Sequence, residues 1–405
     1  MFKFVIVKLV VFLCISCASH TEQHKVNIHN RLLTLDAHLD TPALLVRPDF
    51  DIMQEHSHDH DFSQVDWPRM EKGGLDGGFW VIYTPQGPLN ADAYKSNRDT
   101  ALLRAMAIQT MVSVNPDTFE LATVAEDAHR ITNIGKKVVY ISMENAYPLG
   151  EDLSLLTTFY KLGLRMLGPV HFKNNQFGDS STDPQGSIWG GLSPLGKQLV
   201  AEANRLGIVL DGSHGHDLLL EDLINLSKTP VILSHTGTKT IYDHPRNIDD
   251  TLLKKLADSG GVIHVNAYSA YLTKLPNNPE RQKAYQDLFE KFGRNWSTFD
   301  TETWQALKQA RYQLDKKHPA IKASFEDYMQ HFLHILNVVG PKHVGVGADW
   351  DGGGGVVEMM DISTLPLITE RLLNEGYSEQ DLADIWSNNV LRLLKQAKDY
   401  ADSVN

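Results

Sequence analysis

Short apolar runs rich in Val, Ile and Leu alternate with longer helical patterns through most of the chain. Eight such runs occur, and they span residues 32–38, 79–84, 137–144, 164–171, 207–214, 230–237, 261–268 and 343–352. Several are almost uninterrupted in apolar residues, as is typical of parallel strands buried on both faces. Eight strand–helix units in one chain favour the α/β class and, within it, a closed (β/α)8 TIM barrel over an open doubly wound sheet.

The segments between these runs carry helix signals. One helix is expected to open at Ser193, and another to run from a cap at Asn247 to a stop at Gly260. No glycine-rich phosphate fingerprint follows the first run, which counts against a nucleotide-binding open sheet. The pattern therefore favours a barrel without a nucleotide cofactor.

The stretch 269–342, between the seventh and eighth runs, is too long for an ordinary loop. It contains amphipathic segments at 278–292 and 324–339, so we expect a helical insertion between strands 7 and 8. A lid over the barrel mouth and a structural or oligomer-forming appendage both fit this pattern.

Composition adds two limits. The 405 residues are 42% hydrophobic and 22% charged, which suits one large globular domain, expected over residues 31–400 after a polar tether at 18–30. Lysine and arginine total 38 against 50 aspartate and glutamate, a net charge of −12 without a basic cluster, so a nucleic-acid partner is not expected.

Residues 1–17 have the layout of a signal peptide, with Lys3 and Lys8 before an apolar run and then small residues. Ser16 before Cys17 resembles a bacterial lipobox, although Cys14 replaces its usual leucine; the alternative is a plain secretory signal cut near Ala18. We expect an exported protein, periplasmic or lipid-anchored at Cys17 to a bacterial membrane. The sequence is also compatible with a homodimer.

Residues with metal-binding side chains fall at the ends of the predicted strands. They are His38, Asp40, Glu144, His171, His214, His235 and Asp349. In a β/α barrel all these positions lie at the C-terminal face, where active sites are built. Imidazole and carboxylate ligands suit zinc, and a carboxylate can span two ions, so three histidines with Asp and Glu predict a binuclear site. Such a site suits amide hydrolysis.

Other histidines and acids have plainer interpretations. We interpret His264 as a core residue, and His56, His58 and His60 as solvated loop residues without a strand to position them. Asp211, Asp351 and His216 lie near the site in sequence, and we expect them to support ligands or cap helices.

Seven short motifs occur in one order along the chain. They are DAHLD at 36–40, SMENA at 142–146, GPVHFKNN at 168–175, LDGSH at 210–214, SHTGTKTIYDHPRN at 234–247, GGVIHVNAY at 260–268 and GVGADWDG at 345–352. With them and with DLADIWSNNVLRLL from Asp381, the chain resembles the membrane dipeptidases (renal-dipeptidase-like, peptidase family M19) of the amidohydrolase superfamily. Departures are Asn145 and Ala146, where the family commonly has glycines, and the long stretch after the seventh run.

The resemblance implies a metallo-dipeptidase with two Zn²⁺ ions per chain. His38 and Asp40 would bind one ion, His214 and His235 the other, and Glu144 would bridge both. A bridging hydroxide would then attack the peptide carbonyl of a dipeptide.

Three further roles follow from the same resemblance. Asp349 would act as general base and acid, and His171 would stabilise the oxyanion or hold the substrate. Arg246 would bind the free carboxylate of the substrate, and Tyr271 is a second substrate contact.

Two alternatives stay open. A related binuclear amidohydrolase acting on N-acyl amino acids or another small amide would use Arg246 equally well. A non-catalytic surface lipoprotein with a barrel scaffold is the alternative outside the enzymes.

Overall fold

The computed structural model describes residues 28–293 and 299–405. The predicted signal peptide, with Cys17, and the first ten residues of the predicted tether lie outside the described residues. The last part of that tether departs from the expectation: Ile28 and His29 are buried, and the His29 ring is within 2.6 Å of Thr369 Oγ1 and 2.9 Å of the Gly73 carbonyl. Ile28 and His29 therefore pack against the rest of the protein and do not form part of an exposed tether.

Eight parallel strands form a closed barrel, which confirms the predicted fold class. In order around the ring they are β1 (Leu35–Leu39), β2 (Gly77–Tyr83), β4 (Lys137–Glu144), β5 (Leu164–Leu167), β6 (Val209–Leu210), β7 (Ile232–Thr236), β8 (Val262–Val265) and β9 (Val344–Val346). A short additional strand, β3 (Phe119–Leu121), pairs with the first residues of β4.

Two places in the ring carry much less strand pairing than the rest. The strands from β1 to β6 form one continuous sheet and those from β7 to β9 form another. Single parallel bridges join the two sheets, Leu39 with Trp350 on one side and Asp211 with Ile232 on the other. The Asp40 amide donates to the Trp350 carbonyl at 2.9 Å, and the Gly212 amide to the Ile232 carbonyl at 2.8 Å. We call these two junctions the seams of the barrel.

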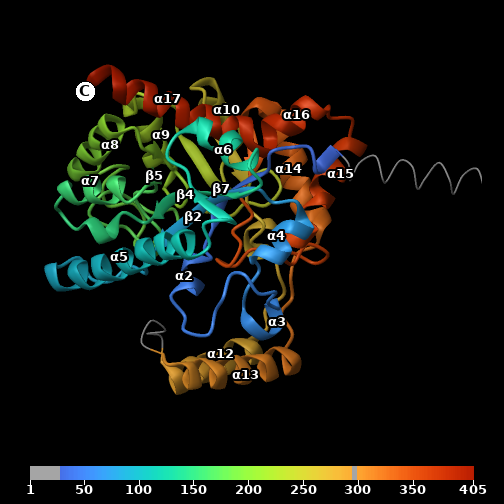
Figure 1. Cartoon of the computed structure of the whole chain (residues 1–405). Helices are drawn as coiled ribbons and strands as arrows, with labels where there is room; N and C mark the ends of the chain where they lie inside the picture. The colour runs from blue at the N-terminus through green and yellow to red at the C-terminus, as the bar shows by residue number, and fades with distance from the viewer. Residues whose placement is uncertain (1–27, 294–298) are drawn as a thin grey trace, which may run out of the picture.

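Helices surround the ring (Figure 1). They are α2 (Pro42–Leu45), α3 (His58–Asp61), α4 (Trp67–Gly73), α5 (Ala91–Val114), α6 (Ala125–Thr132), α7 (Ser154–Lys161), α8 (Pro194–Leu206), α9 (Asp217–Leu226), α10 (Asp250–Asp258), α11 (Ser269–Leu272), α12 (Pro279–Phe292), α13 (Thr301–Lys317), α14 (Phe325–Val339), α15 (Pro366–Asn374), α16 (Glu379–Ala383) and α17 (Asn389–Val404). Among the described residues, none of these helices combines the length and the apolar character needed to cross a bilayer.

Helix ends follow local capping chemistry. Ser193 caps α8, accepting a hydrogen bond from the Gly196 amide, and the helix ends at Gly207 with a φ of 77°, as the sequence predicts. The predicted cap at Asn247 is wrong, because α10 begins after Asp249, whose side chain accepts from the Leu252 amide. The Asn247 side chain instead donates to the carbonyls of Tyr242 and Tyr271.

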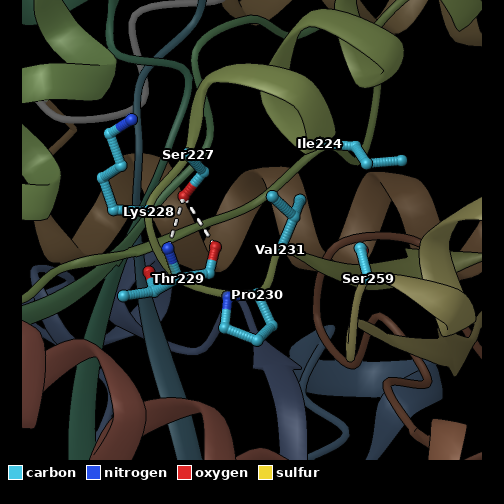
Figure 2. A pocket seen from close by; sticks show the side chains of 7 residues that line it. All are labelled: Ile224, Ser227, Lys228, Thr229, Pro230, Val231 and Ser259. Atoms are coloured by element: carbon cyan, nitrogen blue, oxygen red, sulfur yellow. Dashed lines mark hydrogen bonds between the residues drawn. The ribbon is translucent and has the colours of Figure 1, made fainter.

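The core has a separate layer at the N-terminal end of the barrel. There α17 packs Leu393 and Leu394 against side chains from the first residues of the strands, including Leu35 and Val138. A small hollow of about 120 Å³ lies at the start of β7, beside the turn from α9 (Figure 2). Ser227 holds that turn by donating to the Thr229 carbonyl at 2.7 Å. This end of the barrel is thus held together by apolar packing and by hydrogen bonds to backbone carbonyls.

The stretch 269–342 divides into two parts. The predicted segments at 278–292 and 324–339 correspond to α12 and α14, with caps at Asn278 and Ser324. However, α14 packs on α10, β8 and β9 as an ordinary barrel helix, so it does not belong to a separate body. The helix α13 was not predicted, because few of its positions are apolar; Trp304 and Leu307 are its buried residues.

Helices α12 and α13 pair around a small apolar cluster with Leu288 at its centre. Lys308 of α13 ties this pair to the segment before α4, through Asp49 at 2.6 Å and Asp61 at 3.2 Å. Figure 1 shows the pair on the opposite side of the molecule from α17, next to α3. Whether it acts as a lid stays a prediction.

Candidate metal centre

The seven predicted strand-end residues converge at the C-terminal end of the barrel. Their ligand atoms fall into three mutually close groups of buried residues, each within 4.8 Å. The groups are His38, Glu144 and His235; Glu144, His171 and His214; and His38, Asp40 and Asp349. Residues separated by up to about three hundred positions in sequence meet here because parallel strands end at one face.

Glu144, the last residue of β4, lies at the centre of the cluster. Its Oε1 atom is 2.9 Å from His214 Nε2 and 3.3 Å from His235 Nε2. Its Oε2 atom is 3.8 Å from His38 Nε2. The two oxygens of one carboxylate therefore face two different sets of side chains, which is the geometry a bridging ligand requires.

The set on the Oε2 side combines an imidazole with two carboxylates. His38 Nε2 lies 3.5 Å from Asp40 Oδ2 and 4.0 Å from Asp349 Oδ1. This nitrogen is buried without a hydrogen-bond partner among the described residues. A buried polar atom without a partner is costly, so the donor set fits a bound cation.

Two imidazoles converge on the Oε1 side. The Nε2 atoms of His214 and His235 are 3.0 Å apart, and burial is the largest cause that lowers the pKa of each ring well below the usual histidine value. Both rings are therefore neutral near pH 7, which is the form that binds a metal.

His171 also lies on the Oε1 side of Glu144, closer to this carboxylate than a role in substrate binding alone requires. Its Nε2 lies 3.7 Å from Glu144 Oε1, and its ring packs between Tyr83 and Phe172. Burial, followed by the charge of Arg246, lowers the pKa of His171 well below its usual value. The ring is therefore neutral, so that one of its nitrogens can donate a hydrogen bond and the other can accept one.

The carboxylates need a cation to stay ionised at neutral pH. Burial, more than any other cause, raises the pKa of Glu144 to about 8 and that of Asp349 to about 7. For His38, burial acts to lower the pKa, but the charges of Glu144 and Asp40 outweigh it and raise the pKa to about 10. A divalent cation would compensate these buried negative charges in place of the His38 proton.

A hydrogen-bonded relay fixes the orientation of His235. The Ser234 hydroxyl donates to Asp211 Oδ2 at 2.6 Å and lies 2.8 Å from His235 Nδ1. Because its one hydrogen goes to Asp211, Ser234 accepts from His235 Nδ1, which leaves Nε2 unprotonated and directed at the cluster. Asp211 thus supports His235, a candidate ligand, through Ser234.

Strained backbone accompanies two of these side chains. His214 and Asp349 have φ values of 66° and 65°, in the left-handed region that non-glycine residues seldom adopt. Such strain is concentrated at functional sites, where surrounding structure holds it. Nearby, a side chain at Gly352 would displace the carboxylates of Asp40 and Asp349, so glycine at this position lets both keep their place in the cluster.

Arg246 lies beside the His214–His235 half of the cluster. Its guanidinium donates to the His235 carbonyl at 2.9 Å and to Thr236 Oγ1 at 3.0 Å, while its Nε is buried without a hydrogen-bond partner in the described part of the chain. The Tyr271 ring is 5.8 Å from the guanidinium carbon, so the two predicted substrate contacts are neighbours.

Sequence reasoning missed Arg104 and Tyr83. Tyr83 ends β2 opposite Glu144, and Arg104 of α5 donates to the Tyr83 carbonyl. The charges of Asp40 and Glu144 act to raise the pKa of Arg104 against the larger effect of burial. Arg104 falls in the interior of a long helix, where the sequence carries no signal of proximity to a site.

The remaining sequence interpretations have mixed outcomes. The structure places His264 in the core, 1% exposed, where burial lowers its pKa to about 3. His216 caps α9 through its Nδ1, and Asp351 accepts from Thr41 and Gln64.

The interpretation of the histidine tract as solvated loop is wrong in part. His58 and His60 lie in α3, and the His60 ring stacks on Tyr312 of α13 at 4.2 Å. The His56 ring stacks on Phe50 at 4.4 Å. Contacts with α13, a helix that the sequence did not predict, order this tract.

A parallel eight-stranded barrel with histidines and carboxylates converging at its C-terminal mouth defines the class of metal-dependent hydrolases. Residues 22–405 match the model of the membrane dipeptidase family, peptidase family M19, and the chain belongs to this family. It is therefore an enzyme of the metallopeptidase class, with a metal cofactor.

Individual relatives agree with this assignment. Dipeptidase tcpJ of Claviceps purpurea is 30% identical over 345 residues, which cover 84% of this chain and 70% of the relative. The crystal structure of the probable dipeptidase PvdM from Pseudomonas aeruginosa has a TM-score of 0.78 at 29% identity, covering 93% of this chain and 98% of that one. Another metallopeptidase of family M19, dipeptidase AC, has a TM-score of 0.72 at 25% identity, covering 90% and 98%.

The relay through Ser234 leads to a prediction about metal affinity. Ser234→Ala removes the acceptor for His235 Nδ1, so we expect metal affinity, measured by chelator competition, to fall by about 10- to 100-fold. Ser227→Ala, the same change at the opposite end of the barrel, should leave the affinity unchanged. Equal affinities for both variants would contradict the role given to Ser234.

Proposed function

We propose that this enzyme hydrolyses dipeptides with two Zn²⁺ ions at the mouth of the barrel. The main support is the geometry of Glu144, whose two carboxylate oxygens face two separate sets of candidate ligands. His38 and Asp40 would hold one ion, His214 and His235 the other, and Glu144 both. Imidazole nitrogens with carboxylate oxygens are a donor set that zinc prefers.

Metal ions bound there would supply an acidified water as nucleophile and would polarise the carbonyl of the scissile bond. The residues of the chain divide the remaining work. Asp349 would take the proton released by the nucleophile and pass it to the departing amine, and its position 4.0 Å from His38 supports this role. The neutral His171 ring would donate a hydrogen bond to the developing oxyanion.

Arg246 would select substrates with a free carboxylate. Its guanidinium is buried, its Nε has no hydrogen-bond partner among residues 28–293 and 299–405, and it lies against the strand end at His235, within reach of a group bound at the centre. A planar carboxylate matches the guanidinium better than other anions of its size, and a charge-assisted pair in a dry site is strong. Tyr271 would pack against the same substrate residue. This arrangement limits substrates to those that end just past the scissile bond.

The proposal extends to location. Export is supported by Lys3 and Lys8, which precede an apolar run. The Ser16–Cys17 pair supports a lipid on Cys17 that would anchor the protein to a bacterial membrane. The relatives in this family are described as membrane dipeptidases, which agrees with attachment to a membrane.

Zinc content and activity test the core of the proposal together. Protein loaded with zinc should retain about two equivalents after gel filtration and cleave simple dipeptides such as alanyl-glycine, and chelation should abolish cleavage until zinc is restored. Acetyl-alanine serves as the comparison substrate. One retained equivalent would refute the binuclear site, and cleavage of acetyl-alanine alone would favour the amidohydrolase alternative.

Asp349→Asn tests the proton transfer. The amide keeps the size of the side chain but cannot take a proton, so we expect kcat to fall by at least about 100-fold with zinc content unchanged. Asp351→Asn, a half-buried neighbour that accepts hydrogen bonds from Thr41 and Gln64, should change kcat far less. Loss of zinc from the Asp349 variant, or a rate like that of the wild type, would remove Asp349 from the mechanism.

Arg246→Ala tests carboxylate recognition. We expect kcat/KM for alanyl-glycine to drop by about 10- to 100-fold, mainly through KM, because a charge-assisted hydrogen bond is lost. The matched substrate is alanyl-glycinamide, which lacks the carboxylate and should be cleaved equally by both proteins. A similar drop with both substrates would indicate a structural role for Arg246 instead.

A further inference from the structure

A large chamber adjoins the candidate metal centre. It has a volume of about 990 Å³ and lies between α5, α13 and the turn at 352–354. Its lining includes Leu103, Arg104, Trp304, Arg311, Lys322 and Gly352. We call it the α13 chamber.

The chamber reaches the side of the centre that holds Asp40 and Asp349. Gly352, in its wall, lies so close to those two carboxylates that no side chain fits between them. Arg104, in the same wall, is close enough to Asp40 and Glu144 for their charges to affect its pKa. Arg246, by contrast, lies on the His235 side. With the substrate carboxylate at Arg246, the residue on the amino side of the scissile bond therefore faces the chamber.

Cationic side chains are gathered around this chamber in a chain whose net charge is −12. Five line it: Arg47, Arg104, Arg281, Arg311 and Lys322. Four acids also line it: Asp59, Asp315, Asp351 and Glu358. Which of these charges are compensated decides what the chamber can bind.

Most of these charged side chains already have an ion-pair or hydrogen-bond partner. Arg281 and Arg311 share Asp315, at 2.7 and 3.1 Å. Arg47 pairs with Asp49 at 3.1 Å. Of the acids, Asp351 is held by Thr41 and Gln64.

The two remaining acids lie at the rim. The Asp59 side chain is 80% exposed, and Glu358 is exposed. Neither therefore neutralises the interior of the chamber.

Two of the five cations remain, Arg104 and Lys322. Arg104 donates to the Tyr83 carbonyl and interacts with the charges of Asp40 and Glu144 at the metal centre, so Lys322 is the cation left to bind a ligand away from that centre. It donates to the Gly355 carbonyl at 3.0 Å, and no carboxylate of the described residues lies within 4.0 Å of its ammonium group. Burial, and then the charges of Arg311 and Arg281, lower its pKa to about 8, so the group is charged at pH 7. An anion bound beside Lys322 would offset the electrostatic repulsion between its ammonium group and the two arginines.

Apolar side chains also line the chamber. Leu103 of α5 is 56% exposed, and Trp304 contributes an aromatic ring with Arg47 4.3 Å above it. An exposed leucine in a concave wall favours contact with an apolar ligand segment.

We propose that the α13 chamber binds a long substrate side chain that ends in an anionic group, carried by the first residue of the dipeptide and paired with Lys322. This inference rests on the proposed dipeptidase function and narrows its substrate class. The apolar wall contacts the stem of the side chain, and Lys322 contacts its end. The hydrolysed bond is the same peptide bond, so the chemistry is unchanged.

Three synthetic dipeptides at pH 7 test the proposal. Nε-succinyl-lysyl-glycine is long and anionic, Nε-acetyl-lysyl-glycine is long and neutral, and alanyl-glycine is short. We expect kcat/KM of the zinc-loaded enzyme to be about tenfold higher for the succinyl than for the acetyl substrate, as for a charge-assisted hydrogen bond.

Lys322→Met should abolish that preference while leaving cleavage of the other two substrates unchanged. Lys316→Met, which removes an exposed lysine of α13 outside the chamber, is the matched control and should keep the preference.

The outcomes separate the two proposals. If alanyl-glycine is not cleaved, the dipeptidase function itself fails. If it is cleaved but the succinyl substrate has no advantage, or Lys322→Met and Lys316→Met behave alike, the chamber proposal alone is overturned.

Discussion

The compensation of buried negative charge at Glu144 is the constraint on which the rest of the structure depends. Glu144, Asp40 and Asp349 lie within a few ångströms of one another and are almost fully buried. Without a cation, burial raises the pKa of Glu144 and Asp349 into the neutral range, and the charges of Glu144 and Asp40 outweigh burial to raise the pKa of His38, so that its ring keeps a proton. The barrel, the strained turns and the relay through Asp211 all serve to hold this charge cluster in one geometry.

The sequence predicted the barrel because burial leaves a strong local signal. Strands enclosed on both faces must be apolar along their whole length, and their ends are marked by the first polar residues. For the same reason the convergence of His38, Glu144 and His235 could be predicted: parallel strands end at one face, so position along the strand fixes position in space. Their roles as zinc ligands are carried by the family resemblance and stay a prediction.

Other features had no such signal. The left-handed backbone at His214 and Asp349 is imposed by tertiary contacts, since neither residue type favours it enough to predict it. Arg104 lies inside a 24-residue helix, and its proximity to Asp40 depends on how α5 packs. Helix α13 was missed because it is polar on most of its surface, and with it the chamber and the ordering of His60 were missed too. These features depend on packing between distant segments, which a single sequence does not encode locally.

The two seams of the barrel have a further consequence. One seam joins β1 to β9, and the proposed ligands His38 and Asp40 lie on one side of it with Asp349 on the other. The second joins β6 to β7, between His214 and His235. Each of these two sets of side chains thus spans a junction that has a single strand bridge. Of the proposed ligands, His214 follows β6 in the five-stranded segment and His235 lies in β7 of the three-stranded segment. An ion held by both would join the two segments, so that closing the barrel there and assembling the catalytic centre become one event.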